Sequence, residues 1–440
     1  MFRYLPLLTF VVFGATPERL DQQAKAYFEQ KQFNGTVLVA EGGKIVLSKG
    51  YGMANLEWSI PASPETKFRL GSITKQFTGM SVLLLEQDGK LRTSDPIAQY
   101  IDKAPERWKG ITIHHLLTHT SGIPNFTNFP DYAKTMMVAA PPAETMKRVV
   151  DKPLDFDPGT KMSYSNSGYT LLGLIIEKAS GMRYEDFLRT RIFEPLGMKD
   201  TGYDSDRTVI SRRAAGYEME DEGTVRNASF IDMSIPHAAG AMYSTTLDLA
   251  KWDEGLSAGK LLTPENYKRY FTADKNNYAY GWTVGKRGTD TVLSHGGGIN
   301  GFATMIYRVP ERKLVVVTLS NVLPSQAGKL AQELMRLQLG EDVAVPRVRK
   351  EMAMPVETLE RYIGRYELRA DFVLTVTLEN GQLMTQATGQ GKIPIFAESS
   401  TVFFPKVIDA TLEFQVDPAT GKVTGLVLEQ GGARRPAKKL

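Results

Sequence analysis

Ser72 and Lys75 place a hydroxyl and an amine three residues apart, at the start of a segment that we predict to be helical. Residues three apart in a helix are neighbours on its surface. A serine becomes a useful nucleophile only when a neighbouring group takes its proton. The pair therefore indicates a nucleophile beside a candidate base.

Two S-x-x-K matches occur in the chain, and roughly one or two are expected by chance at this length. Ser72 opens a run with apolar residues at helical spacing that ends at Asp88-Gly89, so we place it at a helix N-terminus, where free N–H groups favour a developing oxyanion. The second match, Ser257-x-x-Lys260, lies between two glycines and lacks the strand and helix that a nucleophile elbow needs. We predict that Ser257 lies in a loop.

Two further motifs supply groups that such a nucleophile needs. Tyr164-Ser165-Asn166 is the only Y-x-N in the chain and directly precedes a predicted helix. A tyrosine and an asparagine on one tight loop can place a phenol and a hydrogen-bonding amide in the same pocket. The alternative is that Tyr164 is a buried, hydrogen-bonded tyrosine without a role in chemistry. The run His295-Gly-Gly-Gly298 ends a predicted strand, where residues without side chains let a substrate approach the backbone closely.

Together these motifs resemble the serine β-lactamases and penicillin-binding proteins, in particular the class C-like branch with its esterases and D-amino-acid peptidases. That family carries S-x-x-K, Y-x-N and K-T-G or H-x-G in this order along the chain. The resemblance covers residues 18–339 and includes the stretches 113–122, 164–173, 193–198 and 239–245. A looser similarity, around Tyr362-Ile-Gly-Arg-Tyr366, links the C-terminal segment to lipocalin-like β domains of some members.

The resemblance implies that Ser72 attacks a carbonyl and forms an acyl-enzyme, which water then hydrolyses. Lys75 and Tyr164 would manage the proton as a coupled pair, and either must lose about three pKa units to act as a base near neutral pH. The resemblance also implies substrate-binding roles for Asn166, His295, Gly297 and Gly298. The backbone N–H groups of Ser72 and Gly298 would hold the oxyanion.

The third motif departs from the Lys-Thr-Gly of many β-lactam and peptide hydrolases, because His295 and Gly296 stand in place of the lysine and the hydroxyl. A histidine is mostly neutral at pH 7, so we expect weaker recognition of a substrate carboxylate. This favours a carboxylesterase that also cleaves amides. The alternatives are a β-lactamase or D-amino-acid peptidase of the same fold and, from another class, a non-catalytic penicillin-binding or sensor protein.

The composition of the chain excludes several classes of cofactor and binding partner. The chain has no cysteine, which excludes disulfides, thiol catalysis and cysteine-ligated zinc, and its net charge is only +4 over 440 residues. We read the basic C-terminal cluster as a solvated end and expect small-molecule ester, β-lactam or D-amino-acid peptide substrates rather than nucleic acid. No carboxylate stands at ligand spacing to the other histidines, so we expect no metal and no cofactor. These histidines are His114, His115, His119 and His237.

The N-terminus reads as a short secretory signal over residues 1–15, with a basic residue, an apolar run and small residues in order. We therefore expect a periplasmic or secreted protein. The apolar run is too short to span a membrane. The sequence leaves the oligomeric state open.

Strand and helix patterns predict an α+β fold of the β-lactamase/transpeptidase type, an antiparallel sheet built from both chain ends and flanked by helices, with an inserted helical region. We expect strands at 35–40, 44–48, 51–58, 280–284, 292–295, 302–308 and 313–320 and a final helix at 325–339. The hydrolase domain would span 16–339 and a linker 340–355. A small barrel-like all-β domain would follow at 356–440, with a hairpin at Asn380-Gly381.

Overall fold

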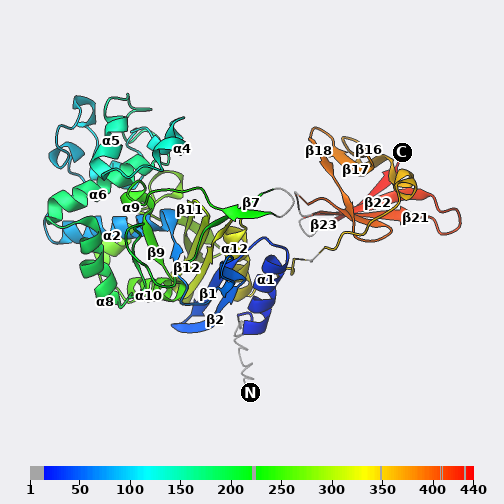
Figure 1. Ribbon diagram of the computed structural model, residues 1–440, viewed down its shortest axis with the longest axis horizontal. Helices are drawn as coiled ribbons and strands as arrows, with labels where there is room; N and C mark the ends of the chain where they lie inside the picture. The colour runs from blue at the N-terminus through cyan, green and yellow to red at the C-terminus, as the bar shows by residue number, and fades with distance from the viewer. Residues whose placement is uncertain (1–13, 221–223, 347–348, 407, 409, 431–432) are drawn as a thin grey trace, which may run out of the picture. The chain divides into compact units, whose positions relative to one another are not determined.

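The computed structural model describes residues 14–220, 224–346, 349–406, 408, 410–430 and 433–440. The chain forms two compact units, residues 1–346 and residues 347–440, both traced in Figure 1. Nearly all of the predicted signal peptide lies outside the described residues, so export stays a prediction.

A six-stranded antiparallel sheet forms the centre of the larger unit (Figure 1). Its order is β10-β11-β12-β13-β1-β2, so the first strand pairs with the last long one, in a register that runs from Gly35 opposite Ser320 to Glu41 opposite Leu314. The strands are β1 (Gly35–Glu41), β2 (Lys44–Tyr51), β10 (Thr283–Arg287), β11 (Asp290–Ile299), β12 (Phe302–Val309) and β13 (Leu314–Ser320). The predicted sheet built from both chain ends is therefore confirmed.

Helices cover both faces of this sheet, because successive side chains of a strand point to opposite faces. Val37 and Val39 join a buried cluster with α1 (Pro17–Glu29) and α12 (Ala327–Gln338). Leu38, between them, joins the larger cluster on the other face, where α2 (Thr74–Gln87) and α10 (Thr246–Ser257) pack. The result is a three-layer arrangement in which α1 and α12 lie side by side on one face.

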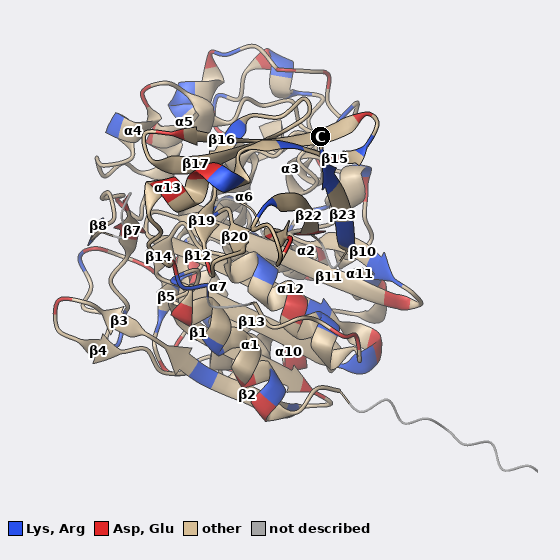
Figure 2. Cartoon of the chain, turned by 90° about the vertical axis from the view of Figure 1, so that its right-hand side faces the viewer, with Lys and Arg blue, Asp and Glu red and all other residues tan. Residues whose placement is uncertain are grey.

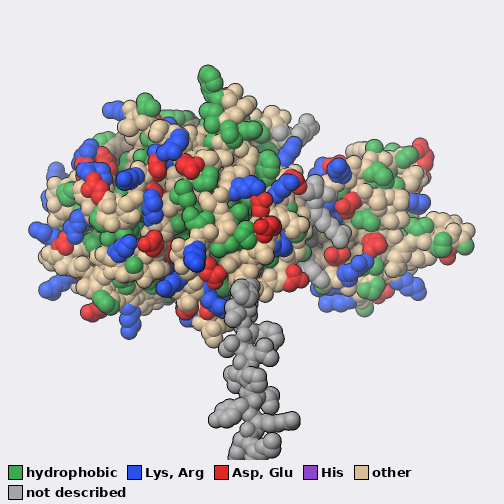
Figure 3. All heavy atoms as spheres, turned by 90° about the horizontal axis from the view of Figure 1, so that it is seen from below, with side chains coloured by type: hydrophobic (Ala, Val, Ile, Leu, Met, Phe, Trp, Pro, Cys, Tyr) green, Lys and Arg blue, Asp and Glu red, His purple; other side chains and the backbone are tan. Residues whose placement is uncertain are grey.

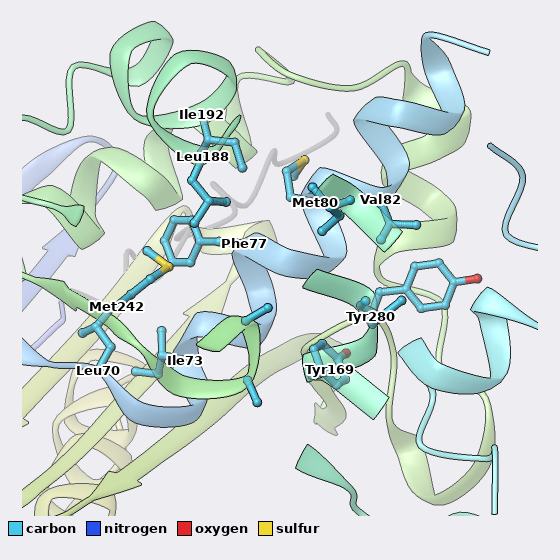
Figure 4. Close-up of a cluster of buried hydrophobic side chains, with 14 of the residues drawn as sticks. Leu70, Ile73, Phe77, Met80, Val82, Tyr169, Leu188, Ile192, Met242 and Tyr280 are labelled. Atoms are coloured by element: carbon cyan, nitrogen blue, oxygen red, sulfur yellow. The ribbon is translucent and has the colours of Figure 1, made fainter. Parts of the chain in front are cut away.

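The region between β5 (Phe68–Arg69) and β10 is mainly helical, as predicted, with a few short strands among the helices. Figure 4 shows Ile73, from the turn just before α2, and Phe77, from α2, pointing into a cluster with Leu70 and Met242. The Phe77 ring also stacks on Trp252 with centroids 4.4 Å apart. The remaining helices are α3 (Ile113–Leu117), α4 (Tyr132–Thr135), α5 (Pro142–Val150), α6 (Asn166–Ser180), α7 (Tyr184–Leu188), α8 (Glu194–Leu196), α9 (His237–Gly240) and α11 (Pro264–Tyr270). The short strands are β3 (Met53–Asn55), β4 (Ile60–Pro61), β5 (Phe68–Arg69), β6 (Gly202–Tyr203), β7 (Tyr217–Met219), β8 (Val225–Asn227), β9 (Met242–Ser244) and β14 (Val322–Leu323).

Two predicted segments differ from the structure because of glycine. The strand expected at 51–58 is reduced to β3, since Gly52 has a left-handed φ of 77° that interrupts it after Tyr51. The strand expected from Tyr280 begins only at Thr283, because Gly281 has a φ of 84°. A Cβ at Gly281 would lie 2.6 Å from the carbonyl oxygen of Lys75, so this turn approaches the S-x-x-K helix closely.

The prediction that Ser257 lies in a loop is wrong: it is the last residue of α10. The helix continues through Gly255, where a Cβ would lie 2.6 Å from a methyl carbon of Leu196. This glycine therefore permits close helix packing rather than a turn. The Ser257 hydroxyl accepts a hydrogen bond from Arg308 at 2.9 Å, and Arg308 is paired with the buried Asp253.

The C-terminal unit is a nine-stranded sheet that nearly closes into a barrel, as predicted. Residues 392–397 join its two ends, because β18 pairs with β17 whereas β19 pairs with β20. The predicted hairpin turn is present, with φ of 50° at Asn380 and 80° at Gly381. Aromatic rings, Tyr362, Phe403 and Phe414 among them, fill the interior. The elements are α13 (Val356–Leu359), β15 (Gly364–Arg369), β16 (Phe372–Glu379), β17 (Gln382–Ala387), β18 (Lys392–Pro394), β19 (Phe396–Ala397), β20 (Val402–Phe404), β21 (Ala410–Val416), β22 (Val423–Gln430) and β23 (Ala433–Lys439).

Residues 340–346 of the predicted linker pack on the larger unit. Val343 is buried against the α1 and α12 cluster, and Glu341 is paired with Arg287 and Arg336. No helix or strand is assigned in the part of 340–355 that the structure describes. The larger unit therefore extends beyond residue 339, where the predicted hydrolase domain ends.

Charges of both signs are mixed over the surface. In Figure 2, α1 and α12 each carry acidic and basic residues. Figure 3 shows lysines and arginines interspersed with carboxylates over the face of the larger unit that it presents. Within the described ranges, every helix is too short or too polar to cross a bilayer.

Candidate active site

Ser72 lies in a single 3₁₀ turn, Gly71–Ile73, that leads directly into α2. The predicted helix is present, but the serine sits in this tighter turn just before its first α-helical residue. Gly71 has a φ of 55°, and a Cβ there would lie 2.8 Å from the amide nitrogen of Gly298. Only glycine therefore lets the nucleophile turn lie against β11.

Lys75 is fully buried, and its Nζ touches three oxygens. These are Ser72 Oγ at 3.1 Å, Asn166 Oδ1 at 2.8 Å and the carbonyl oxygen of Ala239 at 2.8 Å. Among the described residues no carboxylate forms an ion pair with it. Burial disfavours the ammonium ion, so the pKa of Lys75 is lowered well below its usual value.

The partners of Lys75 decide where its lone pair points. The Ala239 carbonyl oxygen and Asn166 Oδ1 can only accept hydrogen bonds, so they take two N–H groups. A neutral amine has two N–H groups, and the remaining lone pair then faces Ser72 Oγ. This arrangement suits removal of the serine proton.

Tyr164 faces the same two residues. The Ser72 hydroxyl lies close enough to the phenol to lower the pKa of Tyr164, although less than burial raises it, and the ring centroid lies 4.7 Å from the Lys75 Nζ. The side chain keeps 36% of its surface exposed, yet burial of the hydroxyl region raises its pKa above the usual value. Of the two candidate bases, Lys75 therefore has the lowered pKa that a base near neutral pH needs, whereas desolvation raises that of Tyr164.

Asn166 begins α6, and two hydrogen bonds hold its backbone and its side-chain amide in place. Its backbone N–H donates to Asn125 Oδ1 at 3.1 Å, and its side-chain Nδ2 donates to Thr127 Oγ1 at 3.2 Å. The side-chain oxygen is thereby directed at Lys75. Asn125 and Thr127 lie just after the T-H-T-S-G stretch, and no spacing in the sequence connects them with Asn166.

The third motif lies within β11, which continues to Ile299 instead of ending at the histidine. Strand β10 pairs only with residues 290–294, so the glycine run borders the Ser72 turn on that side. A Cβ on Gly297 would lie 1.9 Å from the carbonyl oxygen of Leu70, whereas one on Gly298 would meet nothing within 4 Å. Thr304 Oγ1 donates to the same Leu70 oxygen at 2.7 Å and ties β12 to this turn.

His295 is 7% exposed, and both of its ring nitrogens have protein partners. Nδ1 lies 2.6 Å from the Gly296 carbonyl oxygen and must donate to it, so Nε2 accepts from the Tyr278 hydroxyl at 2.9 Å. Burial disfavours the imidazolium form and lowers the pKa of His295 to about 4. The imidazole is therefore neutral at physiological pH, and neither nitrogen is free to donate to a ligand.

The other histidines do not form a metal site. No group of three or more potential ligands occurs in the part of the chain that the structure describes. His114 contacts the Tyr280 hydroxyl, His115 caps α3, and His237 contacts the Tyr203 hydroxyl. His119 alone lies at the motif residues, with its ring centroid 4.3 Å from that of Tyr164.

Comparison with known proteins matches residues 20–340 to the family model described as "Beta-lactamase" and residues 348–436 to a "Domain of unknown function (DUF3471)". Penicillin-binding protein 4* of Bacillus subtilis (strain 168) is 30% identical, over 93% of this chain and 95% of its own. Among solved structures, the octameric penicillin-binding protein homologue from Pyrococcus abyssi has a TM-score of 0.69 and 25% identity, covering 96% of this chain and 99% of its own. D-amino acid amidase from Ochrobactrum anthropi SV3 has a TM-score of 0.62 and 26% identity, covering 73% and 97%.

Proposed function

The chain belongs to the β-lactamase family, and on this premise we propose that it is a serine hydrolase that forms an acyl-Ser72 intermediate. The observation that carries the proposal is the hydrogen bonding of Lys75. Its amine is buried, both N–H groups of its neutral form have acceptor oxygens, and its lone pair faces Ser72 Oγ. A serine beside such an amine is a nucleophile at neutral pH.

In acylation, Ser72 Oγ attacks the substrate carbonyl while Lys75 takes its proton. The charge that develops on the carbonyl oxygen needs hydrogen-bond donors fixed in advance. We assign that role to the backbone N–H groups of Ser72 and Gly298. The close approach of Gly71 to the Gly298 nitrogen supports this assignment.

Breakdown of the tetrahedral intermediate needs a proton for the leaving group. Tyr164 lies beside Ser72, and its raised pKa keeps it a phenol, which is a proton donor. It passes its proton to the leaving oxygen or nitrogen and recovers one from Lys75. Water then attacks the acyl-Ser72 ester, with the same amine as its base.

For the substrate, we propose esters and amides without a carboxylate beside the scissile bond, and carboxylesterase activity first. Recognition of a carboxylate needs a cation or free donors. At this position the structure has a neutral His295 with both nitrogens engaged and a glycine without a hydroxyl. The similarity to D-amino acid amidase adds amino-acid amides as a second substrate class. β-Lactams and D-alanyl peptides, which carry that carboxylate, are the alternative.

Covalent labelling tests the nucleophile. A fluorophosphonate probe followed by peptide mass spectrometry is expected to place the adduct on Ser72, and Ser72→Ala should abolish it. Ser257→Ala is the matched control, because that serine lies in the other S-x-x-K match and should have no effect on labelling. An adduct on Ser257 refutes the assignment, and no adduct with this probe or with a penicillin supports a non-catalytic binding or sensor protein.

A substrate panel then tests the specificity. We expect p-nitrophenyl esters to be cleaved most efficiently, D-phenylalanine amide next, and nitrocefin and D-alanyl-D-alanine peptides least. The ratio of kcat/KM values is the measure of discrimination. A higher kcat/KM for nitrocefin or for the D-alanyl peptide contradicts the proposed role of the neutral third motif.

A further inference from the structure

His119 holds the residues on both sides of Tyr164. Its carbonyl oxygen accepts the backbone N–H of Ser163 at 2.9 Å, and its Nδ1 accepts the backbone N–H of Ser165 at 3.1 Å. One residue thus accepts the backbone N–H of each of the two residues next to the tyrosine. Its ring lies against the Tyr164 ring with centroids 4.3 Å apart.

The backbone of His119 is in the left-handed region, with a φ of 58°. A residue other than glycine or asparagine adopts this conformation at a cost of about 1–2 kcal/mol. Here the conformation lets the carbonyl group and the side chain of one residue reach the same loop. Such a cost is retained when the surrounding structure requires the geometry.

The ring of His119 has a defined tautomer. Nδ1 accepts a hydrogen bond, so the proton of the neutral ring is on Nε2. Nε2 is buried and has no hydrogen-bond partner among the described residues. Tyr169 and Tyr278 cover the rest of the ring, with centroids 5.0 Å and 4.7 Å away. A leucine or phenylalanine would avoid the unpaired Nε2–H but would leave the Ser165 N–H without its acceptor, so Nδ1 is the group by which this histidine acts on the loop.

We propose that His119 is the positioning residue of Tyr164, holding the Ser163 and Ser165 backbone N–H groups so that the phenol hydroxyl meets Ser72. This inference rests on the proposed role of Tyr164 as a proton carrier. The Tyr164 ring lies near both the His119 ring, with centroids 4.3 Å apart, and the Lys75 amine, 4.7 Å from its centroid. Without the Ser165 hydrogen bond the tyrosine loses one of its two backbone anchors, and the proton path between Ser72 and Lys75 loosens.

Two substitutions separate the acceptor from the backbone conformation. Asparagine and glycine both tolerate a positive φ, but only asparagine supplies an acceptor near the position of Nδ1. We expect His119→Gly to lower kcat about 10- to 100-fold, as misplaced catalytic groups do, with a much smaller change in KM. His119→Asn should recover most of that loss. The measurement is kcat per Ser72 labelled by fluorophosphonate, which corrects for misfolded protein.

His115→Ala is the matched control. Its Nδ1 also accepts a backbone N–H, that of Thr112 at 3.2 Å, but it does so at the start of α3, away from the motif residues. We expect a lower melting temperature and an unchanged kcat. Equal kcat per labelled site for wild type and His119→Gly, or no recovery in His119→Asn, overturns the inference.

A measurement on the wild-type protein keeps the inference testable if His119→Gly does not fold. The ¹⁵N chemical shifts of the imidazoles, assigned by difference from His119→Asn, should show an unprotonated Nδ1 at His119 near pH 7. A protonated Nδ1 overturns the inference. If the wild-type protein labels on Ser72 but the tautomer is wrong, the positioning role fails alone. If the protein does not label at all, the proposed hydrolase function fails.

Discussion

Replacing Lys75 by methionine tests whether its buried amine is neutral in the folded protein. Methionine has a similar length and no charge, so it fills the same space without a base. Below its ordinary pKa of 10.5 the unfolded chain carries a charged lysine, whereas burial lowers the pKa of the folded one. Where the folded amine is neutral, unfolding takes up one proton, and the unfolding free energy of the wild type gains about 1.4 kcal/mol for each unit that the pH rises.

The expected signal is a difference between two proteins. Groups other than Lys75 titrate in both, so the unfolding free energy of wild type minus that of Lys75→Met should increase as the pH rises from about 7 to about 9, by up to about 2.7 kcal/mol. The sign follows from the lowered pKa: stability is lost as the pH falls from the unfolded pKa towards the folded one. Hydrogen bonds to Asn166 and Ala239 that the substitution removes shift the difference by an amount that does not depend on pH.

Urea denaturation at each pH, followed by fluorescence, gives these free energies by linear extrapolation. The C-terminal unit is unchanged, so its contribution cancels between the two proteins. The same Lys75→Met protein should lose about 10²- to 10⁴-fold in kcat on a p-nitrophenyl ester, the usual loss for a missing general base. A stability difference that stays constant from about pH 7 to pH 9 shows a charged amine and refutes the role of Lys75 as the base.

Three other predictions follow from the same geometry. Gly297→Ala should lower the melting temperature and kcat, because its Cβ would lie 1.9 Å from the Leu70 carbonyl oxygen. Gly298→Ala is the control, since its Cβ would meet no atom within 4 Å, and equal melting temperatures of the two variants contradict the prediction. Tyr164→Phe keeps the ring and loses the proton carrier, so kcat should fall about 10²- to 10⁴-fold, and an unchanged kcat removes Tyr164 from the mechanism. His295 has a pKa of about 4, so His295→Asn should leave the acidic limb of the kcat/KM profile above about pH 5 unchanged; a shifted limb would mean that the imidazole titrates in catalysis.

The spacing of apolar residues along the sequence predicted most of the helices and strands, because apolar side chains are the ones that become buried. The run from Leu314 to Ser320 is buried at every position, and α12 carries its apolar residues on one face, so both were predictable from local pattern. The segments at Gly52, Gly255 and Gly281 were not. A glycine between apolar residues indicates a turn, and whether it permits a left-handed φ or a close packing contact depends on what lies opposite in the folded chain.

The sequence predicted those site residues that are recognised by their residue type and by the order of their motifs along the chain. Ser72, Tyr164 and His295 are in separate motifs, and their order along the chain pointed to one family before any contact was known. The groups that orient them were not predictable: Asn125, Thr127 and Tyr278 have ordinary surroundings in the sequence, and they reach the motif residues only in the fold. For His119, spacing alone predicts only that no metal is bound, and its contacts in the fold connect it with Tyr164.

By itself the sequence determined which nucleophile stands beside which amine, because Ser72 and Lys75 are one helical turn apart and local geometry is set by local sequence. The tertiary structure decided that the amine and not the phenol has the lowered pKa. The oxygens that bind Lys75 come from positions 91 and 164 residues further along the chain, and the apolar burial around it comes from several helices. A pKa depends on desolvation and on neighbouring dipoles, and only the folded chain brings these together.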